Sequence, residues 1–313
     1  MKVIAKTGEN DIATVYVAKS GGDLIEFVES VQPPLPLASK WVLVVSSMVG
    51  CPVKCIMCDA GGNYKRRLSQ AEILFQIDYM IKQRFPSGKV PVVKFKIQFA
   101  RVGEPTFNFA VLDVLEILPG LYEASGLIPT ISTVAPNGSE LFLEKLIAIK
   151  NRLYPCGKFQ LQFSIHSTDV ALRDNIIPIK KWGFAKIAAF GEQFYVPGDR
   201  KIALNFALAN NSILEVKTLT KYFDPQKFLI KITPVNPTLM AAKNQILSFL
   251  NESNISSMQE LVLNIKQSGY DVIVSVGEFE ENKIGSNCGQ YIEKLSRSNI
   301  RLQNSYKSEL EYL

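Results

Sequence analysis

The stretch Cys51-Pro52-Val53-Lys54-Cys55-Ile56-Met57-Cys58 carries three cysteines at the spacing C-x3-C-x2-C. Three thiolates on one tight loop can each bind one iron of a four-iron cluster and leave the fourth iron open to a small molecule. Fully protein-ligated clusters take four cysteines, and zinc sites pair C-x2-C knuckles with histidines. The spacing therefore predicts a [4Fe-4S] cluster bound by Cys51, Cys55 and Cys58. The alternative is three incidental buried thiols, or two zinc ligands and a spare.

The composition is typical of a globular protein. The chain has 313 residues, of which 47% are hydrophobic and 20% charged, enough for one α/β barrel or two small domains. No apolar run approaches the roughly 18 residues of a membrane helix, and the start does not resemble a signal peptide. Five cysteines, three of them clustered, favour metal binding in a reducing cytoplasm over disulfides. We therefore expect a cytoplasmic protein with no membrane partner.

The net charge of +6 permits a nucleic-acid partner but does not require one. A small basic group with an aromatic residue follows the cysteines, Asn63-Tyr64-Lys65-Arg66-Arg67. It is able to bind phosphate, but a solvated loop has the same composition. The sequence does not decide between these two interpretations.

Strands and helices alternate along most of the chain. Residues 1–31 predict short strands separated by turns, and the proline-rich segment 32–36 interrupts regular structure. About six strand–helix units then predict an α/β fold, a partial or full (β/α) barrel with an N-terminal β-strand extension. We expect the extension over 1–36, the barrel over 37–300 and a C-terminal tail over 301–313. The expected strands are 41–47, 92–100, 128–133, 158–165, 201–208, 227–233 and 271–275, and the expected helices are 69–84, 108–118, 138–150, 169–176, 212–222 and 254–268.

Polar or glycine-rich segments follow the predicted strands at their carboxyl ends. The carboxyl ends of parallel barrel strands meet on one rim, and that rim carries the active site in barrel enzymes. We therefore expect these segments to converge: 50–58, 103–105, 132–133, 164–166, 210–211 and 236–237.

Two sets of motifs carry a resemblance to a known family. The cysteine loop followed by Gly103-Glu104-Pro105 resembles the radical S-adenosylmethionine (SAM) superfamily. The lead-in Val45-Ser46-Ser47-Met48-Val49-Gly50 and the late Asn287-Cys288-Gly289-Gln290 narrow the resemblance to its RlmN/Cfr-like group of ribosomal RNA adenine methyltransferases. The resemblance runs from about residue 24 to 296 and includes, in the family's order, the segments 105–109, 163–167, 173–174, 177–179 and 234–237.

The resemblance implies a cofactor set and its ligands. In the family the amino and carboxylate groups of SAM chelate the open iron. One electron, from a donor such as flavodoxin or ferredoxin, then cleaves SAM to methionine and a 5′-deoxyadenosyl radical. By motif match, Gly103 and Glu104 would meet the amino group of SAM. The residues that would hold its carboxylate, ribose or adenine are Ser132, Ser164, His166 and Asn236.

The resemblance also implies two catalytic residues. Cys288 matches the cysteine that accepts a methyl group from a first SAM. A radical made from a second SAM abstracts hydrogen from that methyl, and the resulting methylene radical adds to carbon 2 or 8 of an adenine. Glu29 matches a family glutamate that acts as proton acceptor. RNA is accordingly a candidate partner.

Each of these residues also has a purely structural interpretation. Glu104 is able to serve as a helix-start carboxylate, and a single histidine such as His166 is often a hydrogen-bonding core residue. Ser132 and Ser164 are also compatible with strand-end turns, and Cys288 with a buried apolar thiol. The agreement of all the motifs in order favours the functional interpretation.

The chain departs from the family at three points. Val44 stands where the methyltransferases carry a second cysteine, seven residues before Cys51, and valine cannot take a proton. Cys156 precedes a predicted strand, which places it at the opposite end of the barrel. The family's separate N-terminal RNA-binding domain is not matched, and Met57 replaces an aromatic residue near the adenine of SAM, a mild change.

Three functions remain compatible with these observations. The first is a radical SAM methyltransferase that works through methylated Cys288 on an RNA adenine or a similar sp² carbon. The second is a radical SAM enzyme of another reaction type, with hydrogen abstraction on a non-RNA substrate and Cys288 redeployed. The third is a non-catalytic, cluster-bearing RNA-binding protein. We favour the first, because the whole SAM-binding rim is retained.

Overall fold

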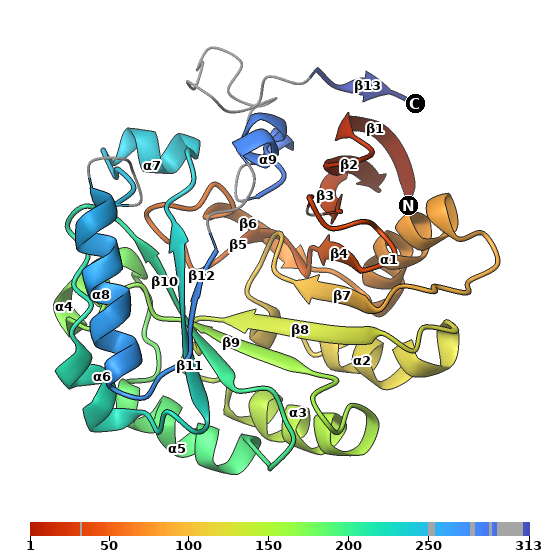
Figure 1. The fold of residues 1–313 in the computed structure, drawn as a ribbon. Helices are drawn as coiled ribbons and strands as arrows, with labels where there is room; N and C mark the ends of the chain where they lie inside the picture. The colour runs from red at the N-terminus through yellow and green to blue at the C-terminus, as the bar shows by residue number, and fades with distance from the viewer. Residues whose placement is uncertain (32, 250–253, 276–278, 288–289, 293–308) are drawn as a thin grey trace.

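The computed structural model describes residues 1–31, 33–249, 254–275, 279–287, 290–292 and 309–313 (Figure 1). Within these residues one sheet of 11 strands runs through the molecule, in the order β12-β11-β10-β9-β8-β7-β4-β3-β2-β1-β13. Neither end strand pairs with the other in the described part, so the barrel is open. Its strands are β1 (Lys2–Glu9), β2 (Ala13–Ser20), β3 (Asp23–Ser30), β4 (Lys40–Val45), β7 (Lys94–Phe99), β8 (Leu127–Thr133), β9 (Gln160–Ser164), β10 (Ile202–Leu208), β11 (Phe228–Pro234), β12 (Val272–Val274) and β13 (Glu311–Tyr312).

The sheet has a parallel part and an antiparallel part. All pairs from β4 to β12 are parallel, whereas β1, β2 and β3 pair antiparallel with each other and β3 pairs antiparallel with β4. The predicted fold class, a mostly parallel α/β sheet with N-terminal strands, is confirmed. The division into domains at residues 36 and 300 stays a prediction.

Helices cover the outer side of the parallel part (Figure 1). All six predicted helices are present, with their ends shifted by a few residues. The helices along the sheet are α1 (Gln70–Arg84), α2 (Ala110–Leu121), α3 (Glu140–Leu153), α4 (Val170–Ile176), α5 (Phe184–Phe194), α6 (Val216–Tyr222) and α8 (Ile255–Gln267), and the short ones are α7 (Leu239–Lys243), α9 (Phe279–Ile284) and the 3-10 turn η1 (Pro105–Phe107).

The helix α5 was not predicted, although its sequence carries the signal. Phe184, Ile187, Phe190 and Phe194 recur every three or four residues and are all buried, the spacing of an amphipathic helix. A second omission is the two-stranded sheet of β5 (Met48–Cys51) and β6 (Gly62–Arg67). These strands flank the cysteine loop; β5 has only four residues, and β6 is polar throughout apart from Tyr64, so neither carries an alternating strand pattern.

Alternation along each parallel strand separates an apolar face from a polar one. In β7 the side chains of Phe95, Ile97 and Phe99 are buried in the main core, under the helices. Lys96 and Gln98 alternate with them and point to the inside of the curved sheet. The inner face is therefore the polar face, and the carboxyl ends of the strands open onto it.

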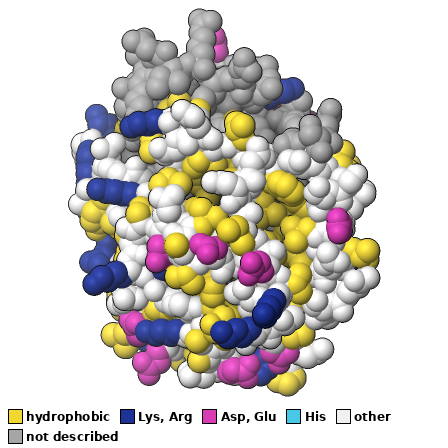
Figure 2. Space-filling model, turned by 90° about the vertical axis from the view of Figure 1, so that its left-hand side faces the viewer, with side chains coloured by type: hydrophobic (Ala, Val, Ile, Leu, Met, Phe, Trp, Pro, Cys, Tyr) yellow, Lys and Arg dark blue, Asp and Glu magenta, His cyan; other side chains and the backbone are white. Residues whose placement is uncertain are grey.

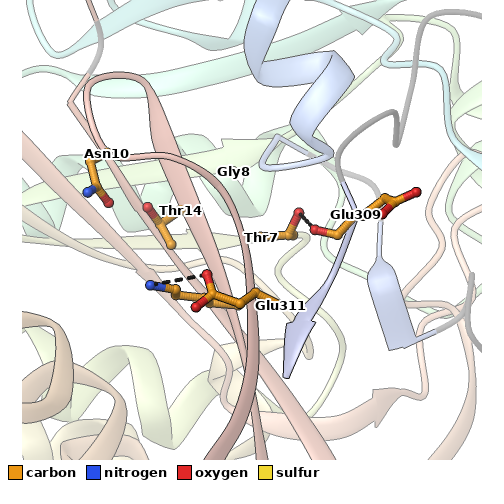
Figure 3. A pocket seen from close by; sticks show the side chains of 7 residues that line it. Thr7, Gly8, Asn10, Thr14, Glu309 and Glu311 are labelled. Atoms are coloured by element: carbon orange, nitrogen blue, oxygen red, sulfur yellow. Dashed lines mark hydrogen bonds and ion pairs between the residues drawn. The ribbon is translucent and has the colours of Figure 1, made fainter. Parts of the chain in front are cut away.

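The end of the chain returns to its beginning. β13 pairs antiparallel with β1, and the Thr7 hydroxyl donates to the carbonyl oxygen of Glu309 at 2.8 Å (Figure 3). A polar hollow of about 390 Å³ lies beside this contact, lined by residues such as Asn10, Thr14 and Glu311. No cysteine lines it, so it is separate from the rim described below. No helix among the described residues is both long and apolar enough to span a membrane.

Candidate radical SAM site

The cysteine loop is carried by the β5–β6 hairpin at the carboxyl end of β4. Cys51 is buried at the end of β5, and Cys55 and Cys58 are half-buried in the loop; none of the three forms a disulfide with another described cysteine. The Cys58 N–H donates to the Cys55 carbonyl at 3.1 Å, which closes a tight turn. Gly50 has φ +70, and a Cβ there would lie 2.4 Å from the carbonyl oxygen of Asn63. Only glycine allows the two strands to approach so closely at this point.

The far side of the rim holds the loop in place. The Thr238 hydroxyl, just after β11, donates to the Met57 carbonyl at 2.7 Å. The Asp59 carboxylate accepts from the N–H groups of Leu239 at 3.2 Å and Met240 at 2.9 Å. Because residues some 180 positions apart in the chain make these bonds, the loop is positioned by the barrel and not only by its own hairpin.

The surroundings of the three thiols fit an iron–sulfur cluster. Burial raises the pKa of Cys55 well above its usual value, and the neighbouring Cys58 and Cys51 raise it further. Burial likewise raises the pKa of Cys51 to about 12. A bound cation would reverse this, because a coordinating thiol is deprotonated. The thiols share an apolar shell with Val53, Ala60, Val102, Val134, Ile176 and Ile177.

The donor set of the loop fits a cluster better than a single metal ion. An iron–sulfur cluster distributes its thiolates over several irons, and here three thiols of one loop lie in an apolar shell. Among the described residues no group of three His, Cys, Asp or Glu side chains is placed to hold a single metal ion.

The Gly103-Glu104 pair lies directly beside this loop. Gly103 has φ +107, and a Cβ would lie 2.7 Å from the Ser47 hydroxyl and from Met48 Cβ. The Glu104 carboxylate accepts from the Thr106 hydroxyl at 2.8 Å and from the Val134 N–H at 3.0 Å. Burial raises its pKa.

Glu104 fits both of its predicted roles. Its negative charge contributes to the raised pKa values of Cys51 and Cys55, which places it near them. It also caps η1 by accepting from the Thr106 N–H at 3.2 Å. The Thr133 side chain is a further hydrogen-bond partner of the Glu104 carboxylate. The contact with SAM stays a prediction.

His166 is neutral and has one ring nitrogen engaged. Desolvation by the surrounding protein lowers its pKa to about 4, and the positive charge of Arg173 contributes. Its Nδ1 accepts from the Ala207 N–H at 3.1 Å, so the ring proton lies on Nε2. This matches the core role, and it also leaves Nε2 as a hydrogen-bond donor for a ligand. His166 has φ +64, a conformation in which His is enriched among non-glycine residues.

The other predicted SAM ligands end neighbouring strands. Ser132 and Ser164 are half-buried near or at the ends of β8 and β9, and Asn236 follows β11. Ser164 is paired in register with Asn205 of β10. The structure thus brings Ser132, Ser164, His166 and Asn236 to one rim with the cysteine loop, and their individual roles stay predictions.

Asn205 is a rim residue that the sequence interpretation missed. Its side chain is 7% exposed, and its Oδ1 has no hydrogen-bond partner in the described part of the molecule. Buried polar atoms are nearly always paired. An acceptor left open beside Ser164 is therefore a place for a donor group of a bound ligand. A polar residue at the centre of an otherwise apolar strand, Ile202–Leu208, was the available signal.

The two predicted catalytic residues have different outcomes. Cys288 lies outside the described residues. Glu29 is buried on the outer face, where its carboxylate accepts from Tyr16 at 2.7 Å and Trp41 at 3.0 Å and is ion-paired with Arg84. The structure does not bring Glu29 together with the rim. Its role as proton acceptor stays a prediction, and these contacts do not favour it.

The basic group after the cysteines forms β6 and is partly neutralised. Lys65 and Arg66 are ion-paired with Asp23 at 2.9 and 2.8 Å, and Arg66 also pairs with Glu72 at 2.8 Å. Arg66 lowers the pKa of Glu72 to about 2. Tyr64 remains 42% exposed.

A cavity of about 310 Å³ separates this hairpin from the antiparallel strands. It is lined on one side by residues of the hairpin, including Gly50 and Asn63, and on the other by Glu26 of β3. Gln290 and Ile292 complete it, and they lie two and four residues after Cys288 in the sequence.

Comparisons with known proteins agree with this site. No family model matches the chain. It is 27% identical over 265 residues to the dual-specificity RNA methyltransferase RlmN of Wolinella succinogenes, covering 80% of this chain and 70% of the relative. It is 31% identical over 221 residues to the protein of that name from Caulobacter vibrioides, covering 67% of this chain and 52% of the relative. The chain therefore spans only part of these proteins.

Solved structures share the fold. A radical SAM methyltransferase from Sphaerobacter thermophilus matches with a TM-score of 0.70 at 18% identity, covering 92% of this chain and 80% of that one. Streptococcus suis SuiB bound to S-adenosylmethionine matches with a TM-score of 0.53 at 16% identity, covering 75% and 49%. The fold and the three-cysteine rim define a radical SAM protein. Within that superfamily the chain is similar to the RlmN/Cfr-like group, whose members use a [4Fe-4S] cluster and SAM.

Proposed function

We propose that the chain is a radical SAM methyltransferase that carries a methyl group on Cys288 and delivers it to an sp² carbon, with an RNA adenine as the substrate. The observation that carries this proposal is the convergence of the three-cysteine loop, Gly103-Glu104 and the ends of β8 to β11 on one rim. Its support from comparison is the similarity to proteins named as RNA methyltransferases.

The residues of the rim divide into cluster ligands and SAM ligands. Cys51, Cys55 and Cys58 would hold the cluster, which when bound supplies the electron that cleaves SAM. Glu104, as a buried acceptor, suits the ammonium group of SAM. The neutral Nε2–H of His166 suits an acceptor such as a carboxylate or ribose oxygen.

The remaining rim positions supply hydrogen bonds and exclude water. The hydroxyls of Ser132 and Ser164, the side chain of Asn236 and the open acceptor of Asn205 would orient SAM along the ends of the strands. The apolar shell that includes Val102 and Val134 would keep water from the reacting atoms, as an enzyme that produces a radical requires.

The position of the cavity supports a nucleotide substrate. It lies between the cysteine hairpin and the segment that follows Cys288, and its volume is at the lower end of the range for small-ligand sites. Tyr64 and Arg67 are exposed on the same hairpin, where an aromatic ring can stack on a base and a guanidinium can pair with phosphate. The α8 side of the molecule differs from this hairpin, because acidic and basic side chains both occur there around a hydrophobic middle (Figure 2).

The proposal includes an electron donor and a cellular compartment. A one-electron donor such as flavodoxin or ferredoxin would reduce the cluster. The three clustered thiols on the loop, which form no disulfide among the described cysteines, suit a reducing cytoplasm.

A second candidate function rests on Val44. This residue replaces the second cysteine of the family and packs against the apolar cluster that includes Val28 and Ile284. Cys156, an exposed thiol, lies before β9 at the opposite end of the strands. A radical SAM reaction of another type, which needs no second cysteine, accounts for this replacement.

Mass spectrometry separates the two candidates. The protein is reconstituted with iron and sulfide under anaerobic conditions and incubated with SAM and a reductant, and 5′-deoxyadenosine is measured in the same tube. A methyl group on Cys288, absent from Cys156 in the same sample, supports the methyltransferase. Production of 5′-deoxyadenosine with an unmodified Cys288 supports the other reaction type and rejects the adenine substrate.

A further inference from the structure

One buried guanidinium joins three distant parts of the chain. Arg101 lies two residues after the end of β7, and its side chain is 1% exposed. It is ion-paired with Glu26 of β3, whose side chain is fully buried. The same guanidinium donates to the carbonyl oxygens of Gly285 at 3.0 Å, Ser286 at 2.8 Å and Asn287 at 3.2 Å. These three carbonyls immediately precede Cys288 in the sequence.

The partner of Arg101 holds the chain on the other side of Cys288. The second carboxylate oxygen of Glu26 accepts from the Ile292 N–H at 3.2 Å. Gln290 and Tyr291, just before it, are 5% and 1% exposed. The ion pair therefore contacts the chain both before and after Cys288.

The segment before Cys288 arrives at the ion pair on a docked helix. Ser30 of β3 donates a hydrogen bond to the Glu281 carboxylate of α9. Ile284 of the same helix is 1% exposed and packs in the apolar cluster that includes Val28. Gly285 ends the helix with φ +78. The carbonyls of residues 285–287 follow the helix, and the planar fork of the Arg101 guanidinium binds all three.

We propose that Arg101 and Glu26 form a clamp that fixes residues 285–287 and 290–292, which flank Cys288 in the sequence, at the carboxyl end of β7. In this role both are positioning residues that act through Cys288. The inference deepens the proposed function and rests on it, because Cys288 is the proposed methyl carrier. Glu26 also lines the cavity together with Gln290 and Ile292, so the clamp sets the wall of the proposed substrate site.

The alternative is an ion pair that only stabilises the core. Removing one member of any buried pair destabilises a protein, because the other charge is left uncompensated. The test therefore needs a variant that keeps the charges and a matched pair elsewhere. Arg101→Lys keeps the positive charge beside Glu26 but lacks the fork. The double variant Glu26→Gln with Arg101→Met removes both charges.

The chain supplies a matched control in Lys150 and Asp199. This ion pair is also buried, with side chains 1% and 5% exposed, and Lys150 also donates to a backbone carbonyl, that of Phe194, at 2.8 Å. It joins α3 to the segment before β10, at the amino ends of the strands. The double variant Lys150→Met with Asp199→Asn removes it.

Two measurements use the protein without added cofactors. Hydrogen exchange read by mass spectrometry reports the protection of residues 285–292, and iodoacetamide labelling reports the reactivity of Cys288, with exposed Cys156 as internal reference. In both clamp variants we expect exchange and Cys288 labelling about 10-fold faster than wild type, from the loss of charged hydrogen bonds. After reconstitution we expect unchanged iron content and SAM binding, and Cys288 methylation about 10-fold slower.

The result that would overturn the clamp is unchanged exchange and labelling in both clamp variants. An equal acceleration throughout the molecule in clamp and control variants would also overturn it, because it would show general destabilisation. If wild-type Cys288 is never methylated, the proposed function fails, and local acceleration confined to 285–292 still establishes the clamp.

Discussion

The parallel strands β4 to β12 and the antiparallel strands β1 to β3 belong to one sheet but support different parts of the site. The parallel part carries the cysteine loop, Gly103-Glu104 and the predicted SAM-binding positions at its carboxyl rim. The antiparallel part contributes Glu26 and the inner surface on which α9 packs. One part thus carries the predicted cofactor site, and the other contacts the segments next to the proposed methyl carrier. In the proposed mechanism the cofactor and the methyl carrier are therefore held by two different parts of the same sheet.

The largest expected effect is the loss of 5′-deoxyadenosine production when a cysteine at the carboxyl rim, but not one at the amino end of the strands, is replaced. We expect Cys55→Ala to lower 5′-deoxyadenosine production by at least about 1000-fold, because the cluster supplies the chemistry that the protein lacks. Cys156→Ala, at the amino end of β9, is the control and should retain production. Iron content per chain and 5′-deoxyadenosine are the readouts. Full iron content in the Cys55 variant would remove the cluster assignment.

A second effect tests whether Glu29 belongs to the outer core or to the site. Glu29→Gln removes the buried carboxylate that is ion-paired with Arg84. Because the guanidinium of Arg84 then lacks a counter-charge, we expect a loss of about 3 kcal/mol in the free energy of unfolding. Urea denaturation of the cofactor-free protein measures it. A proton-acceptor role predicts the opposite pattern: unchanged stability with a loss of product after Cys288 methylation.

A third effect concerns the glycine of the SAM motif. Gly103→Ala places a Cβ 2.7 Å from Ser47 and Met48 at φ +107, and we expect a loss of about 1–3 kcal/mol in stability together with weaker SAM binding. Gly120→Ala is the matched control, because Gly120 lies in α2 with nothing within 4 Å of the added Cβ. It should stabilise the protein by about 0.5–1 kcal/mol. Equal effects of the two substitutions would contradict the close approach at Gly103.

The smallest effect is a pH dependence from His166. Its pKa is lowered to about 4 in the folded state from the usual 6.5, so the unfolded state binds the proton more readily. The resulting stability is fully present above pH 6.5 and is lost as the pH falls from 6.5 towards 4. His166→Asn removes the group while tolerating the positive φ.

Urea denaturation at pH 7.5 and pH 5 measures the contribution of His166 to the free energy of unfolding. The carboxylates with lowered pKa values, such as Glu72 and Glu140, titrate below this range and do not obscure it. We expect the wild type to lose more stability than His166→Asn between the two pH values. An identical loss in both proteins would show that His166 is not desolvated.

The sequence by itself determined the features that depend on local spacing. The three cysteines occupy one loop because the last lies only seven positions after the first, whatever the rest of the chain does. The parallel strands were predictable because buried strands alternate or run apolar over short lengths. Gly50 and Gly103 lie in segments that were predicted to follow strands at the rim, and the structure adds the contacts that exclude a side chain there.

Only the tertiary structure decided the features that join distant segments. Arg101 contacts residues 75 positions earlier and up to 186 positions later in the chain, and no periodicity or motif encodes such a contact. The same holds for Glu29, whose face of the sheet is set by its register with Leu43, since a shift of one residue would reverse it. Spacing fixes which groups share a loop, whereas packing and strand register fix which groups from separate loops meet.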